Sequence, residues 1–123
     1  MILFVFLLLF PVQIYCQSAE KADALYDRAS SLYELARYEE AIELFEQCAE
    51  IDSRLGKDRR SDLTYDYKLL GMSHMQLSGM ERAEDFLKKA LGIFSGLGEA
   101  AQEAEIANYL GYQISNRQTT YAK

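Results

Sequence analysis

Few side chains of this sequence have the types and spacing that catalysis or metal binding require. His74 is the single histidine, so a nucleophile–base pair or a zinc site would depend on it alone. The two cysteines are Cys16 and Cys48, and Cys48 falls among apolar residues at helical spacing, where a packed thiol is expected. We therefore predict no enzyme activity, no metal and no cofactor. If this chain were instead a small enzyme, His74→Ala or Cys48→Ser should abolish its activity.

Two further segments resemble binding loops only in part. Ser95-Gly96-Leu97-Gly98 holds a glycine pair but lacks the lysine of a phosphate-binding loop, so a helix-ending turn is expected. The segment 58–62 mixes charges of both signs, which favours a solvated connection between repeats, with a docking site as the alternative. The net charge is −6, the wrong sign for phosphate backbones, so we expect no nucleic-acid partner and infer no small-molecule substrate.

The start of the chain resembles an export signal. Residues 1–10 are all apolar, Pro11 follows them, and the first charged side chain is Glu20. This run fits a secretory signal and is shorter than the roughly 20 apolar residues of a membrane span. We predict a signal peptide over 1–16, with cleavage after Ala19 as an alternative, and an exported product that is periplasmic, envelope-associated or secreted. Lipidation of Cys16 and an uncleaved anchor or packed helix remain alternatives, and the membrane is expected to matter only through this segment.

The remaining sequence has the apolar spacing of helices. Apolar and small residues recur three and four positions apart over 22–36 and again over 41–51, and the pattern returns over 63–77, 83–93 and about 100–116. Breaks fall at Arg37-Tyr38 and at Ser78-Gly79. The pattern predicts an all-α chain of antiparallel helix pairs.

The helix pairs repeat. When residues 38–48 are aligned with 80–90, small residues coincide with small ones and a large apolar residue with another, and Leu70-Gly71 matches Leu110-Gly111 in the same way. Small residues are needed where two helices cross closely, and a bulky one fills the groove beside them. The residues predicted to pack the repeats are Ala29, Ala41, Phe45, Cys48, Gly71, Ala83, Leu87, Ala90 and Gly111.

The repeated pattern resembles the tetratricopeptide repeat. The second half of that motif is nearly intact in Tyr38, Ala41, Phe45 and Cys48, and the first half in Tyr67, Leu70 and Gly71. The resemblance covers about residues 20–117, and the units are about 40 residues apart, as in extended variants of the family. Departures from the motif are Arg28, Ser53, His74 and Met80.

The resemblance implies a tetratricopeptide-like α-solenoid of about two and a half repeats over residues 17–123. Its units would span about 20–53, 62–96 and 100–123, and the third is incomplete. The last helix is therefore either a cap or the start of a further unit in a longer protein.

Function is implied by the same resemblance, because the first helices of such repeats line a groove that receives a peptide or a partner's helix. The groove positions transfer to Asp23, Tyr26, Ser30, Tyr33, Lys68, Met72, Met75, Asn108 and Tyr112. Tyr26 and Ser30 stand where one subgroup places its clamp for a chaperone's terminal carboxylate, so that docking is not expected. We predict a protein- or peptide-binding scaffold or assembly factor in the extracytoplasmic space of a bacterium. The alternative is the N-terminal sensory or regulatory segment of a larger signalling or catalytic protein.

Overall fold

The computed structural model describes residues 2–121, and the side chains of 18–112, 114 and 115. Its α-helices are α1 (Ile2–Glu34), α2 (Tyr38–Leu55), α3 (Arg60–Gln76), α4 (Met80–Leu97) and α5 (Ala100–Tyr121), and η1 (Gly56–Arg59) is a 3-10 helix. No strand occurs in this part of the chain. The all-α repeat class predicted from the sequence is confirmed.

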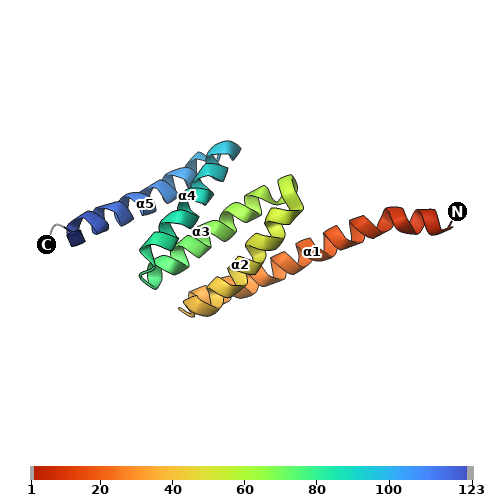
Figure 1. Ribbon diagram of the computed structural model, residues 1–123, viewed down its shortest axis with the longest axis horizontal. Helices are drawn as coiled ribbons and strands as arrows, with labels where there is room; N and C mark the ends of the chain where they lie inside the picture. The colour runs from red at the N-terminus through yellow and green to blue at the C-terminus, as the bar shows by residue number, and fades with distance from the viewer. Residues whose placement is uncertain (1, 122–123) are drawn as a thin grey trace.

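The helices follow one another in a row of antiparallel pairs (Figure 1). Helix α1 packs against α2 and α3 against α4, while α2 contacts α3 and α4 contacts α5. The N-terminal half of α1 projects beyond the other helices (Figure 1). It contains most of the predicted signal segment, whose side chains lie outside the described residues, and removal of that segment stays a prediction. Over the residues described, no helix has both the length and the apolar character needed to cross a bilayer.

The turn inside each helix pair repeats in detail. Ala36 and Ser78 occupy the same place and have left-handed backbones, with φ of 59° and 62°. In both turns the next amide donates to the carbonyl five residues earlier, at 2.9 Å for Arg37 and 2.8 Å for Gly79. This bond identifies the turns as Schellman motifs. The predicted helix end at Ser78-Gly79 is thus made by the serine, and Gly79 precedes the first residue of α4.

The predicted packing positions form the centre of each pair. Seven of them are completely buried: Ala29, Ala41, Phe45, Cys48, Ala83, Leu87 and Ala90. One core cluster surrounds Phe45 and a second surrounds Leu87 and Phe94. Small residues at the crossings let the helices approach, as the alignment of the two units requires.

Gly71 shows how close the second pair is. A Cβ built on Gly71 would lie 2.7 Å from Cγ of Leu87 and 3.2 Å from the carbonyl oxygen of Ala83, so no larger residue fits without displacement. Gly111 differs from this expectation. It is exposed, and a Cβ there meets nothing within 4 Å, because within the described residues no helix covers that face of α5. The packing role predicted for Gly111 is therefore not seen.

The connection between the two pairs contains an irregular turn. The charge pattern of 58–62 predicts a solvated connection. In the structure the chain leaves α2 at Gly56, where φ is +81°, and forms η1 before α3 begins. The extra residues of this long repeat form the turn that carries Arg59. The turn thereby positions Arg59 in the candidate functional site.

Candidate functional site

A pocket of about 210 Å³ opens where α1, the end of α2, η1 and the start of α3 meet. We call it the acidic pocket. Four carboxyl groups, one guanidinium and two phenol rings line it: Asp23, Asp52, Asp62, Asp66, Arg59, Tyr26 and Tyr65.

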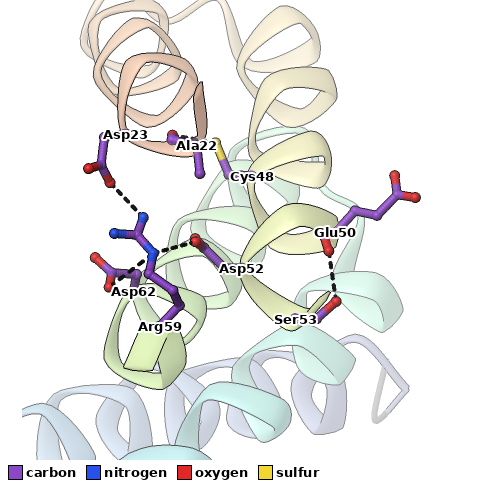
Figure 2. Close-up of polar contacts among 8 residues, drawn as sticks. All are labelled: Ala22, Asp23, Cys48, Glu50, Asp52, Ser53, Arg59 and Asp62. Atoms are coloured by element: carbon purple, nitrogen blue, oxygen red, sulfur yellow. Dashed lines mark hydrogen bonds and ion pairs between the residues drawn. The ribbon is translucent and has the colours of Figure 1, made fainter. Parts of the chain in front are cut away.

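Arg59 connects three elements across the floor of the acidic pocket (Figure 2). Its Nε donates to Oδ1 of Asp52 at 2.8 Å, and its Nη2 donates to Oδ1 of Asp23 at 2.5 Å. Asp62 lies further away, with Oδ2 at 3.6 Å from Nε. Burial opposes the charge, but the hydrogen bonds to Asp23 and Asp52 dominate and raise the pKa of Arg59 above its ordinary value. The guanidinium therefore stays charged and is the counter-ion of the buried Asp52.

Asp66 is the least exposed residue that lines the acidic pocket, with 1% of its surface accessible. Among the described residues no N–H or hydroxyl group donates to its carboxyl oxygens, and its polar neighbour is the carboxyl group of Asp52. Burial, together with the neighbouring Asp52 and Asp62, raises the pKa of Asp66 to about 9, against a smaller opposing effect of Arg59. This shift favours the protonated carboxyl group at neutral pH, and a positive charge placed beside it would favour the anion.

Two tyrosines form aromatic walls of the acidic pocket, one from each repeat. Tyr26 packs edge-on against Phe45, with ring centroids 5.7 Å apart. Tyr65 packs in the same way on Phe94 at 5.4 Å, and its hydroxyl accepts a hydrogen bond from Gln102 at 3.4 Å. These contacts hold both rings in place before any partner arrives.

Of the groove residues predicted from the sequence, only Asp23 and Tyr26 line the acidic pocket. Tyr33 packs edge-on against Tyr38 at 5.4 Å and adjoins the first core cluster. Met75 is partly buried against the second cluster. These side chains contribute to packing between helices as well as to the surface.

The other predicted groove residues differ in exposure. Nζ of Lys68 pairs with Glu105 at 2.8 Å, so an internal carboxylate already engages it. Ser30 is partly buried, and its Oγ has no hydrogen-bond partner among the described residues. Met72 is partly buried, whereas Asn108 and Tyr112 are exposed on α5.

The two side chains considered for chemistry both lie in the interior. Sγ of Cys48 donates to the carbonyl oxygen of Ala22 at 3.5 Å (Figure 2), and burial raises the pKa of this thiol to about 12. His74 stacks on Phe86 with ring centroids 5.6 Å apart, and burial lowers its pKa. Over the described residues, no three histidine, cysteine, aspartate or glutamate side chains come together as metal ligands could.

Asp52, Tyr65 and Asp66 were not predicted from the sequence, whereas Arg59 and Asp62 belong to the segment 58–62, for which a docking site was the alternative prediction. A signal for Asp52 is present in the sequence, because it continues the buried positions of α2 at helical spacing, four residues after Cys48. A carboxylate on a core-facing line needs a positive or hydrogen-bonding partner. Arg59 could not have been identified as that partner without the path of η1.

Comparison with known families gives one match. A tetratricopeptide repeat model matches residues 20–95, which run from α1 through most of α4. A comparison with curated proteins finds no match. The matched region includes every residue that lines the acidic pocket.

Proposed function

Because the chain belongs to the tetratricopeptide repeat family, we propose that it binds a protein or peptide outside the cytoplasm, as a scaffold or an assembly factor. Repeats of this family generally mediate protein–protein interactions and are not typically enzymes. The observation that carries the proposal is that the matched region coincides with two helix pairs whose first helices, α1 and α3, share one walled pocket.

The mechanism we propose is binding to a preformed surface. We call the side of the molecule formed by α1, α3 and α5 the groove face. The tyrosine rings and the Arg59 network there are held by packing and hydrogen bonds. Little side-chain entropy is therefore lost on binding. The pocket is negative, which favours a protein partner over a nucleic acid.

The apolar residues at the start of the sequence support the part of the proposal that concerns export. The test is the intact mass of the native protein from fractionated host cells. Export predicts a species in the envelope or medium that lacks residues 1–16, or 1–19 for the alternative cleavage site. A full-length species confined to the cytoplasm would contradict export and leave the binding function to be tested separately.

Binding itself is tested by selecting a random peptide library on the purified protein. We expect enriched peptides to bind the native chain and to lose affinity at least tenfold with Met72→Glu combined with Tyr112→Ala on the groove face. Gln47→Glu, an exposed position on α2, is the control and should bind as the native chain does. Circular dichroism verifies that each variant is helical. The proposal fails if no peptide is enriched, or if folded groove-face variants bind all enriched peptides normally.

A further inference from the structure

Among the residues that line the acidic pocket, negative charges outnumber positive ones. Asp23, Asp52 and Asp62 face a single guanidinium, that of Arg59. Two of these carboxylates remain solvent-accessible, with side chains 60% exposed for Asp23 and 47% for Asp62. A cation entering the pocket therefore meets carboxylates at its rim before it reaches the floor.

The buried end of the pocket has an unused acceptor. Asp66 is 1% exposed and lines the pocket, and among the described residues no N–H or hydroxyl group donates to its oxygens; its polar neighbour is the carboxyl group of Asp52, which favours the protonated form of Asp66. The ionised form of this carboxyl group would be costly, because Asp52 offers its oxygens neither an N–H donor nor a positive charge. A ligand with several N–H donors and a positive charge would satisfy both oxygens. Asp66 would release its proton as the cation arrives.

The volume of the pocket and its aromatic residues restrict the kind of ligand that it can bind. Its volume of about 210 Å³ is below the roughly 300–1,000 Å³ typical of sites that enclose a whole small molecule. It suits one side chain. Tyr26 and Tyr65 line the pocket with aromatic rings, and Nζ of Lys68 already lies 6.0 Å from the centroid of the Tyr65 ring. Aromatic rings attract cations, and they stack best on a planar guanidinium. Guanidinium groups also bind carboxylates through paired hydrogen bonds and are less strongly hydrated than ammonium groups.

We propose that the acidic pocket receives the side chain of an arginine from the bound protein or peptide, held between Tyr26 and Tyr65 with its guanidinium on Asp66 and the rim carboxylates. This inference rests on the proposed function and names the chemistry of the partner. The pocket lies between the two repeats, so the arginine would anchor a segment that crosses from α1 to α3.

The test is an NMR titration of the purified chain with acetyl-Gly-Arg-Gly-amide, read from backbone amide shifts. We expect saturable shifts centred on residues of the acidic pocket. The same peptide with citrulline, which is nearly isosteric and uncharged, should bind at least tenfold more weakly. Equal binding of the two peptides would overturn the proposal. Free L-arginine is the second comparison, and binding that requires its free amino and carboxyl groups would show an amino-acid site instead.

Substitutions inside and outside the acidic pocket test whether the arginine peptide binds there. Asp66→Asn keeps the shape of the protonated carboxyl group but cannot become an anion, and it should weaken the arginine peptide about tenfold. Asp62→Asn, at the rim, should lower the affinity for the arginine peptide by a smaller factor. It replaces Asp66→Asn as the test if the buried substitution perturbs folding. Asp85→Asn makes the same change on the exposed side of α4 and should leave affinity unchanged. Normal binding by both pocket variants would overturn the proposal. Library peptides that need the groove face but carry no basic residue would overturn it while the binding function stands.

Discussion

Nε of Arg59 lies 2.8 Å from Oδ1 of Asp52, at the point where α2 ends and the second repeat begins. Asp52 is 2% exposed, and the Arg59 side chain is 14% exposed. Removing either partner of an ion pair this far from solvent is strongly destabilising, because the other charge would stay buried without a counter-ion. The contact joins the two repeats and gives the acidic pocket its floor.

Removing this guanidinium should destabilise the protein severely. We expect Arg59→Gln to cost about 3 kcal/mol of unfolding free energy, because Asp52 would stay buried without a counter-ion. The measurement is urea denaturation followed by circular dichroism. Arg54→Gln is the matched control, since its ion pair with Glu50 is exposed and should contribute less than about 1 kcal/mol. Equal effects of the two variants would contradict the central position of Arg59.

The close approach of α3 and α4 gives a second prediction. Gly71→Ala places a methyl group 2.7 Å from Cγ of Leu87 and should cost about 1–3 kcal/mol through overpacking. Gly92→Ala is the control within α4, because a Cβ there meets nothing within 4 Å. It should stabilise the helix by about 0.5–1 kcal/mol. The measurement is thermal unfolding of both variants. If Gly71→Ala left the stability unchanged, the close packing of α3 on α4 would be refuted.

The left-handed turns give a third prediction. Ser78 has φ of 62° without being glycine, a conformation that costs about 1–2 kcal/mol for a residue with a Cβ. Ser78→Gly should therefore raise the unfolding free energy by up to about 1 kcal/mol. Ser95→Gly, at an exposed position inside α4, should lower it. Urea denaturation that ranks the two variants the other way round would contradict the assigned turn.

The protonated Asp66 gives a fourth prediction, on pH. Its pKa rises from 3.8 to about 9 on folding, so between these values the native state holds a proton that the unfolded chain has released. Stability contributed by this group is then greatest below pH 4 and is lost as pH rises toward 9, by at most about 1.4 kcal/mol per pH unit. Asp66→Asn should remove this loss and be more stable than the native chain at pH 8.

The control for this pH effect is Asp85→Asn, whose pH profile should follow that of the native chain. Denaturation at pH 5 and at pH 8 gives the difference for each protein. A native chain and an Asp66→Asn variant with parallel profiles would show that Asp66 is ionised in the folded state.

Reactivity of Cys48 is the fifth prediction. Its thiol is buried, and its pKa is raised to about 12, so almost no thiolate exists at pH 8. Iodoacetamide should modify Cys48 only after denaturation, as read by mass spectrometry of the peptide that contains it. Rapid labelling of the native protein would mean that α2 opens away from α1.

The sequence was sufficient to predict the repeat core and insufficient to predict the acidic pocket. Ala41 and Ala83 recur in register because helix crossings require small residues, and a local pattern of that kind is visible in one chain. The approach of Arg59 to Asp23 depends on a non-helical turn at Gly56, which no periodicity encodes. Lys68 shows the same limit, since its pairing with Glu105 on α5 removes it from the free surface.

Hydrogen–deuterium exchange of the chain with and without a selected library peptide tests the central claim most directly. If the groove face binds the partner, amides of α3, of the end of α1 and of α5 should gain protection, while exchange in α2 and α4 changes little. For a selected peptide that contains arginine, Asp66→Asn should weaken this protection at the same peptide concentration. Protection confined to α2 and α4, or no protection at saturating peptide, would contradict binding by the groove face.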